Sequence, residues 1–343
     1  MNDQVNANDI KIGVVGAGSW GTSLANLLAL KGYKIDLWVF EKEVKDQIET
    51  YRENKIFLPG FALSDNVFPS NDMARVVNGK ELLLIVVPSH VMRETAHKMS
   101  AHLSNKTTVV SASKGIENKT HLTMTGVLHE VLAIPENALA VLSGPSFARE
   151  VAKKFPTVVT VASKDPQVAR TVQHVFATDY FRVYTSDDVI GVELGSAVKN
   201  VIAIAAGITD GLGLGLNTRA ALITRGLVEI RRLGVKLGAN PRTFTGLAGV
   251  GDLVLTCTGD LSRNHTLGEK IGAGMQLKDI LSEMYMVAEG VKTAKSVYNL
   301  SRKLGVEMPI VHEVYHVLYE NVAPIEAVRR LMTRDLKDEL DEQ

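Results

Sequence analysis

Residues 10–21 read Ile-Lys-Ile-Gly-Val-Val-Gly-Ala-Gly-Ser-Trp-Gly, and this stretch decides how the first half of the chain folds. A short β-branched run ends in Gly16-x-Gly18-x-x-Gly21, and a helical pattern follows over residues 22–29. A strand, a glycine turn and a helix in this order are the fingerprint of a dinucleotide-binding unit. Gly16 permits the turn, Gly18 lets the backbone approach a pyrophosphate, and Gly21 allows close packing of helix and strand. The alternative is a tight turn without a ligand.

The composition is that of an ordinary globular protein, with 343 residues, 45% hydrophobic and 22% charged. This length allows two domains. The 38 basic and 38 acidic side chains cancel, so no strong field attracts nucleic acid or an anionic membrane. Residues 1–9 lack the apolar core of a signal sequence, and Asp210 and several glycines interrupt the most apolar stretch, residues 201–216. We therefore expect a cytoplasmic protein that neither binds nucleic acid nor inserts into a membrane.

Strand-like and helical patterns alternate through the first half of the chain. The apolar run at residues 82–87 is typical of a strand buried on both faces of a parallel sheet. The pattern predicts a Rossmann-like, doubly wound α/β sheet, whose ligands lie beyond the carboxyl ends of its strands. The expected strands are residues 10–15, 34–39, 82–87, 107–111, 138–142 and 157–162.

Helical patterns replace the strands from about residue 187 onward. The sequence therefore predicts a dinucleotide-binding domain over residues 1–186 and an all-α domain for substrate binding and catalysis over residues 187–343. The expected helices are residues 187–207, 218–237, 263–273, 277–284, 291–304, 309–319 and 324–331.

Lys199 is the most unusual residue of the first of these helices, which is otherwise apolar on nearly every side. Small residues stand at four-residue intervals along its face and leave a groove beside it: Gly191, Gly195 and Ala203. Burial lowers the pKa of an amine, which suits Lys199 to act as general acid or base toward an alcohol or carbonyl. The alternative is a close helix crossing, with Lys199 extending to the surface.

A second group of residues, 246–257, is rich in glycine and carries Asp252 in its midst. Ser262-Arg263-Asn264 follows, just before an expected helix, where side-chain donors and helix N–H groups can converge on an anion. The planar fork of arginine suits phosphate. The alternative is a loop with an N-cap serine and a solvated arginine. Cys257 is expected to be a small buried residue.

Two turns follow expected strands, at residues 111–115 and 143–148, where ligand contact is favoured over an ordinary loop. The first places Lys114 at the ligand edge of the sheet. The glycines of residues 211–215 follow a helix, so we interpret them as an interhelical connection without a phosphate role. The nine histidines show no ligand spacing, and no metal site is expected.

Taken together, these motifs are highly specific, and the chain resembles the bacterial NAD(P)-dependent glycerol-3-phosphate dehydrogenases from about residue 10 to about residue 330. The motifs occur in order: Gly-Ala-Gly-Ser-Trp-Gly (16–21), Ser-Lys-Gly-Ile-Glu (113–117), Ser-Gly-Pro-Ser-Phe-Ala (143–148), Val-Lys-Asn (198–200), and Gly-Val-Gly-Asp-Leu with Ser-Arg-Asn (249–253 and 262–264).

The resemblance implies an enzyme that interconverts sn-glycerol 3-phosphate and dihydroxyacetone phosphate with NAD or NADP. It also implies a homodimer that supplies phospholipid synthesis. Lys199 would be the catalytic acid and base, with Asn200 and Thr256 helping to orient and bind the substrate. The substrate site would comprise Lys114, Gly144, Ser146, Lys199, Asp252, Ser262, Arg263 and Asn264. The cofactor site would comprise Gly16, Gly18, Ser19, Trp20, Gly21, Phe40, Lys114, Ala148, Arg263, Val287 and Glu289.

The sequence departs from the family's pattern at Phe40, where relatives often carry a basic residue or a histidine. Glu41 lies about 20 residues beyond Gly21, where a carboxylate bonds a free ribose hydroxyl and repels a 2′-phosphate. Lys42 can offset this repulsion in part, so the choice between NAD and NADP stays open.

Two other functions compete with this interpretation. The first is another β-hydroxyacid-type dehydrogenase, in which Arg263 would bind a carboxylate; Ser-Arg-Asn beside Gly-Val-Gly-Asp favours phosphate. The second is a nonenzymatic dinucleotide sensor, which would keep its activity after loss of Lys199.

Overall fold

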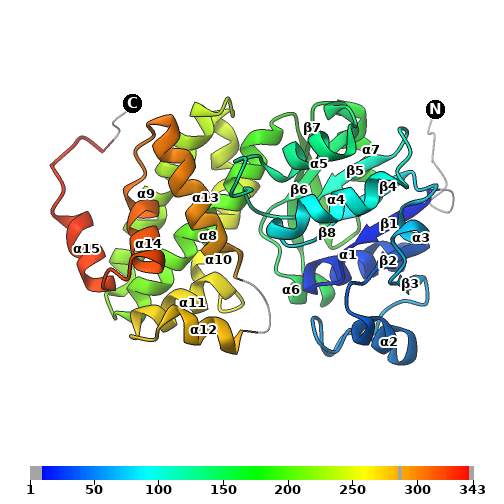
Figure 1. Cartoon of the computed structure of the whole chain (residues 1–343), viewed down its shortest axis with the longest axis horizontal. Coiled ribbons are helices and arrows are strands. Elements are labelled where there is room, and N and C mark those ends of the chain that lie inside the picture. Colours follow the sequence, from blue (N-terminus) through cyan, green and yellow to red (C-terminus); the bar gives the residue numbers. More distant parts are fainter. Residues whose placement is uncertain (1–9, 285–287, 340–343) are drawn as a thin grey trace. The chain divides into compact units, whose positions relative to one another are not determined.

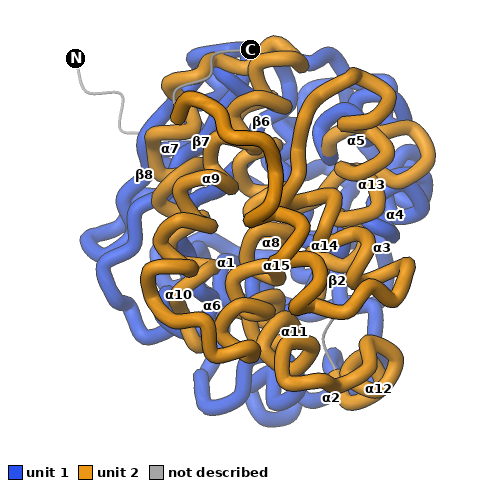
Figure 2. The backbone as a smooth tube through the Cα atoms, turned by 90° about the vertical axis from the view of Figure 1, so that its left-hand side faces the viewer, with its two compact units in different colours: residues 1–113, 124–189 blue, residues 114–123, 190–343 orange. Residues whose placement is uncertain are grey.

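The computed structural model describes residues 10–284 and 288–339, which form two compact units. The first unit comprises residues 1–113 and 124–189, and the second comprises residues 114–123 and 190–343 (Figure 2). Residues 114–123 therefore group with the second unit although they lie in the first half of the sequence.

The first unit is built on an eight-stranded sheet in the order β3-β2-β1-β4-β5-β6-β7-β8 (Figure 1). Neighbouring strands are parallel except β6 and β7, which are antiparallel. The order reverses at β1, where parallel α/β sheets bind ligands. The strands are β1 (Ile12–Val15), β2 (Ile35–Trp38), β3 (Val67–Ser70), β4 (Leu82–Ile85), β5 (Thr108–Ser111), β6 (Leu139–Ser143), β7 (Thr157–Ser163) and β8 (Phe181–Ser186).

Helices of this unit form two packed groups, as a doubly wound sheet requires. α1 packs on α6 and α7, whereas α4 packs on α3 and α5. The strands between them are apolar, and β1 and β4 are buried along their whole length. The helices are α1 (Ser19–Leu30), α2 (Lys42–Tyr51), α3 (Met73–Val77), α4 (Met92–Ser100), α5 (Met124–Leu132), α6 (Ala148–Ala152) and α7 (Pro166–Phe176), with short turns η1 (Ser89–Val91) and η2 (Glu136–Ala138).

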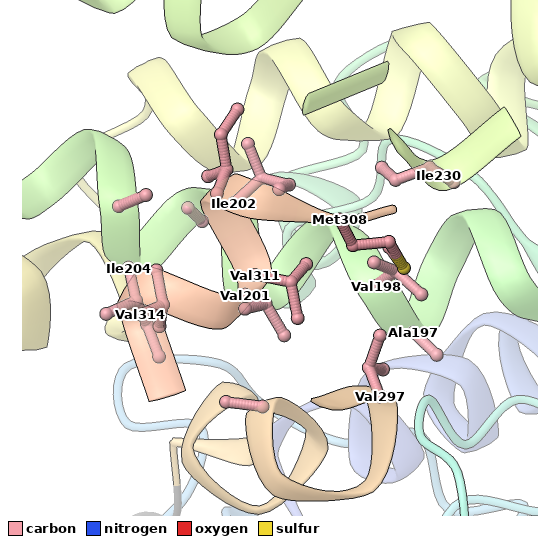
Figure 3. Packing of buried hydrophobic residues seen from close by; sticks show 14 of the residues in the cluster. Ala197, Val198, Val201, Ile202, Ile204, Ile230, Val297, Met308, Val311 and Val314 are labelled. Atoms are coloured by element: carbon pink, nitrogen blue, oxygen red, sulfur yellow. The ribbon is translucent and has the colours of Figure 1, made fainter. Parts of the chain in front are cut away.

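The second unit is helical and is organised around α8 (Val189–Gly211). Its core joins α8 residues such as Val201 to Val297, Val311 and Ile230 of three other helices (Figure 3). The remaining elements are α9 (Gly215–Lys236), η3 (Pro241–Thr245), η4 (Leu247–Gly251), α10 (Asp252–Thr258), α11 (Arg263–Gly272), α12 (Leu277–Glu283), α13 (Glu289–Leu304), α14 (Pro309–Tyr319) and α15 (Pro324–Met332).

A buried carboxylate ties two of these helices together. Glu229 of α9 accepts hydrogen bonds from the backbone N–H groups of Ile310 (2.7 Å) and Val311 (3.2 Å) in the first turn of α14. These groups have no partner within their own helix. Burial raises the pKa of Glu229 to about 8, against the opposing effect of the two N–H donors.

Among the described residues, α8 is long and apolar enough to cross a membrane. Its most apolar window is 94% buried inside the protein, as is usual for the central helix of a folded domain. The expected fold class, a Rossmann-like doubly wound sheet followed by an all-α part, is confirmed.

The structure adds three elements that the sequence did not predict. β3 contains Pro69 and lies at one edge of the sheet, and β8 lies at the other edge. Its burial alternates over Phe181, Arg182 and Val183, as in a half-exposed strand. The third element, α10, begins at Asp252, directly after the glycines that suggested a loop.

Candidate functional site

The β1–α1 turn has the geometry that a dinucleotide requires. Gly16 has a φ of +115°, which disfavours any residue with a side chain. A Cβ on Gly21 would lie 1.9 Å from the carbonyl oxygen of Gly16, so helix and turn are in direct backbone contact. A Cβ on Gly18 would meet no protein atom within 4 Å among the described residues. The turn therefore leaves room at Gly18, where a pyrophosphate would approach α1.

The helix after this turn begins without a side-chain cap, because its N-cap residue is Gly18. The N-terminal end of a helix favours an anion. The hydroxyl of Ser19 donates to the carbonyl of Phe57 (2.5 Å), and Trp20 is half-buried against the apolar core of the unit. The turn thus fits the phosphates of a dinucleotide.

The other expected ligand residues of the first unit follow its strands. Phe40, just after β2, is 71% exposed and lies 6.0 Å from the ring of Trp38. Gly144, just after β6, has a φ of +153°, and its carbonyl accepts a hydrogen bond from Ser146 Oγ (2.9 Å). Ala148 is the first residue of α6.

Lys199 is buried in the middle of α8, with 4% of its surface exposed. Its ammonium contacts the carboxylate Oδ1 of Asp252 and donates to the hydroxyl of Thr256 (2.6 Å). Thr256 Oγ1 in turn donates to the backbone carbonyl of Asp252 (2.6 Å). The amine is therefore held in one place within the helical unit and does not extend to the surface.

Asp252 holds two lysines at once. Its Oδ2 accepts from Lys114 Nζ (2.8 Å), while Oδ1 faces Lys199, and Asp252 itself is fully buried. Lys114 arrives from the segment 114–123, and its side chain is 19% exposed. One carboxylate thus balances two cations, of which one is buried and one reaches solvent.

The glycines around Asp252 serve close packing against α8. A Cβ on Gly195 would lie 2.4 Å from the carbonyl of Ala248, and one on Gly249 would lie 2.2 Å from that of Phe244. The groove expected beside Gly195 is therefore occupied by η4. This close approach brings the start of α10, and with it Asp252, to Lys199.

Burial changes the proton affinity of the two ionisable groups beside Asp252. It lowers the pKa of Lys199 to about 7, with the charge of Lys114 adding to this effect and the charge of Asp252 opposing it. The amine can therefore give or take a proton near neutral pH. Burial raises the pKa of the Cys257 thiol to about 12, and Cys257 is a small buried residue as expected.

The start of α11 carries the Ser-Arg-Asn motif. Ser262 is the N-cap and accepts a hydrogen bond from the backbone N–H of His265 (3.2 Å). Asn264 donates to the side-chain oxygen of Asn200 (3.0 Å) and accepts from the N–H of Gly290 (2.9 Å). These bonds connect α11 to α8 and to the start of α13.

Arg263 lies between Ser262 and Asn264 in the sequence, and its side chain is exposed. Glu289 is the first residue of α13. Val287 lies outside the described residues.

Within the second unit the structure brings together four of the expected residues, Lys114, Lys199, Asp252 and Thr256, in one hydrogen-bonded network. The sequence did not indicate that Asp252 bridges both lysines, because the contacts span more than fifty residues. The contacts of His265 with the carboxylates of Asp210 and Glu269 were also not predicted.

Comparisons with known proteins agree along the whole chain. Residues 11–169 match the family model for the NAD-dependent glycerol-3-phosphate dehydrogenase N-terminus, and residues 188–329 match the model for its C-terminus. A protein of Syntrophobacter fumaroxidans named glycerol-3-phosphate dehydrogenase [NAD(P)+] is 59% identical over 332 residues, which cover 96% of this chain and 97% of that protein. A relative of the same name from Citrifermentans bemidjiense is 57% identical over 331 residues, 96% of this chain and 98% of its own.

A solved structure is similar over the same length. The crystal structure of glycerol-3-phosphate dehydrogenase from Coxiella burnetii has a TM-score of 0.91 and 40% sequence identity, and the match covers 95% of this chain and 99% of that one.

Proposed function

The chain belongs to the NAD-dependent glycerol-3-phosphate dehydrogenase family, and on that premise we propose how its side chains interconvert sn-glycerol 3-phosphate and dihydroxyacetone phosphate. The observation that carries the proposal is the buried amine of Lys199, fixed by Asp252 and Thr256 and with its pKa lowered to about 7.

Lys199 is the general acid and base of the reaction. In the reduction of dihydroxyacetone phosphate, its ammonium donates a proton to the carbonyl oxygen as that oxygen becomes a hydroxyl. In the oxidation of glycerol 3-phosphate, the neutral amine takes the same proton back. The nicotinamide cofactor, when bound, supplies or accepts the hydride. The protein thus moves one proton in each direction.

Asp252 positions this amine and sets its charge. A buried ammonium without a counterion would lose its proton, because burial disfavours the charged form. The carboxylate of Asp252 keeps the protonated form of Lys199 populated at neutral pH, and it also pairs with the ammonium of Lys114. Lys114, which reaches solvent, lines the substrate site together with Lys199.

The phosphate of the substrate is bound at the start of α11. Arg263 offers two parallel N–H donors, and Ser262 and Asn264 flank it at a helix end that favours anions. Asn200 supports Asn264 through the bond between their side chains. Gly144 and Ser146 complete the proposed set of substrate residues.

NAD or NADP binds along the β1–α1 turn. Gly16, Gly18 and Gly21 admit the pyrophosphate, and Ser19 and Trp20 extend this surface into the first turn of α1. Phe40, exposed after β2, is proposed to contact the adenosine end. The remaining cofactor residues of the proposal are Lys114, Ala148, Arg263, Val287 and Glu289.

A Lys199→Met variant tests the central assignment. It keeps the approximate size of the side chain but removes the amine that carries the proton, so turnover falls by at least about a hundredfold. NADH binding, followed by fluorescence titration, stays within twofold of wild type. The matched control is Lys236→Met, which removes an exposed lysine at the end of α9 and leaves turnover unchanged. A folded Lys199→Met enzyme with near-native turnover would show that the lysine is structural.

The same premise extends to the roles of the two domains, the cellular location and the oligomeric state. Residues 1–186 would bind the dinucleotide, and residues 187–343 would bind the substrate and carry catalysis. The enzyme would act as a cytoplasmic homodimer and supply glycerol phosphate for phospholipid synthesis. The supporting features are the balanced charge of the chain and the near-complete match to bacterial relatives.

A further inference from the structure

A group of three side chains lies apart from the network around Lys199. Asp210 near the end of α8 and His265 and Glu269 of α11 each offer a ligand atom, and these atoms lie within 4.8 Å of one another. They line an open cavity of about 360 Å³ together with Asp260 and Arg219. Three carboxylates thus face this cavity, against one guanidinium.

The hydrogen bond to Asp210 fixes how the imidazole of His265 is protonated. Nε2 lies 2.7 Å from Oδ2 of Asp210, and His265 is buried with 5% of its surface exposed. An ionised carboxylate only accepts hydrogen bonds, so Nε2 carries a proton and donates it. In the neutral ring, Nδ1 then presents its lone pair.

A second carboxylate lies near Nδ1. Nδ1 lies 3.6 Å from Oε2 of Glu269, four residues later on the same helix. This distance is longer than a normal hydrogen bond. The gap between Nδ1 and Oε2 leaves room for an ion that contacts both atoms.

The spacing suits a metal ion. Zinc binds imidazole nitrogen and carboxylate oxygen at about 2.1 Å, and an ion at that distance from two atoms 3.6 Å apart subtends an angle of about 118°. This is close to tetrahedral. Histidine ligands of metals commonly donate their other N–H to a carboxylate, which is the role that Asp210 fills here.

We propose that His265 Nδ1 and Glu269 bind a divalent transition-metal ion of the zinc type, with Asp210 holding the imidazole in place and water filling the open positions. The mixed nitrogen and oxygen ligands favour such an ion over magnesium or calcium. Arg219 lies 3.4 Å from Oδ2 of Asp210 and opposes the ion through its charge.

The test is isothermal titration of the chelator-treated enzyme with zinc chloride. The wild type should bind one zinc ion per chain at this site, and a Glu269→Gln variant should bind it at least about tenfold more weakly. This change keeps the size of a half-exposed side chain, so the fold is retained. His265→Ala should abolish the site, and Asp210→Asn should weaken it by about 10–100-fold.

Two further titrations make the result specific. Glu320→Gln removes another carboxylate that follows a histidine, His316, by four residues, at 3.9 Å, and should leave zinc binding unchanged. Magnesium chloride should give no comparable heat. Absence of zinc binding at millimolar concentration, or equal binding by wild type and Glu269→Gln, would overturn the proposal.

Discussion

Replacing Asp252 by asparagine removes the charge that keeps Lys199 protonated, and its consequence can be worked out from the structure. Two unit charges about 4 Å apart interact by about 4 kcal/mol at an effective dielectric constant of about 20. One pKa unit corresponds to about 1.4 kcal/mol, so complete loss of the interaction would lower the pKa of Lys199 by about 3 units. The asparagine oxygen keeps part of the hydrogen bonding, and we expect a decrease of at least about 1 unit.

The starting pKa of about 7 makes this decrease visible in the rate. At pH 7 most Lys199 side chains in Asp252→Asn would be neutral. The protonated fraction would fall from about one half to about one tenth for a 1-unit decrease, so kcat/KM for dihydroxyacetone phosphate should fall at least about fivefold. The assay follows NADH oxidation from about pH 5.5 to about pH 9. The midpoint of the profile should move to lower pH.

A matched variant separates this effect from a general loss of charge. Asp279→Asn removes an exposed carboxylate at the start of α12 and should leave both the rate and the midpoint unchanged. Thermal unfolding of Asp252→Asn is measured alongside, to establish that this variant is folded. An unchanged midpoint in a folded Asp252→Asn enzyme, or one that moves to higher pH, would refute the electrostatic account of Lys199.

Four further substitutions test the substrate and cofactor sites. Arg263→Ala should weaken kcat/KM for dihydroxyacetone phosphate by about 2–4 kcal/mol through loss of a charge-assisted pair, while activity on unphosphorylated dihydroxyacetone, already low, should hardly change; an equal loss on both substrates would remove the phosphate assignment. Gly18→Ala should raise the dissociation constant of NADH, measured by fluorescence titration, at least about tenfold without lowering Tm. Gly21→Ala should lower Tm, measured by calorimetry, because its Cβ overlaps the Gly16 carbonyl. A lower Tm for Gly18→Ala with unchanged NADH binding would contradict the proposed role of Gly18. Glu41→Ser should raise the NADPH-to-NADH ratio of kcat/KM about tenfold, equal to about 1.4 kcal/mol of relieved repulsion, and an unchanged ratio would place cofactor selection elsewhere.

The structure shows where the two charged residues after Phe40 lie. Glu41 is the N-cap of α2, and Lys42 is the first residue of that helix. Both side chains are exposed. The position of Lys42 relative to Glu41 is therefore set by the first turn of α2, and the sequence around residue 40 did not predict this helix start.

Local patterns were sufficient for most of the fold. The continuous apolar run of β4 and the glycine turn after β1 are determined by short stretches of sequence, and both were predicted. The edge strands were missed because their patterns are weaker. Pro69 in β3 argues against a strand, although an edge position tolerates it.

The site could be predicted in its parts but not in its connections. Lys199 stands out as a charged residue in an apolar helix, which is a local signal. Its partnership with Asp252 depends on Gly195 and Gly249, whose lack of side chains allows η4 to approach α8. The Asp210–His265–Glu269 group gives no local signal in the sequence, because Asp210 lies 55 residues before His265.

The exchange of a proton between Lys199 and the substrate is tested by measuring kcat/KM against pH in both directions of the reaction. Reduction needs the protonated amine, so kcat/KM for dihydroxyacetone phosphate should fall as pH rises through about 7, while oxidation of glycerol 3-phosphate needs the neutral amine and should rise over the same range. Lys199→Met should lose both inflections, which separates the lysine from titration of the substrate phosphate. Profiles that change in the same direction, or that keep their inflections in Lys199→Met, would contradict the claim.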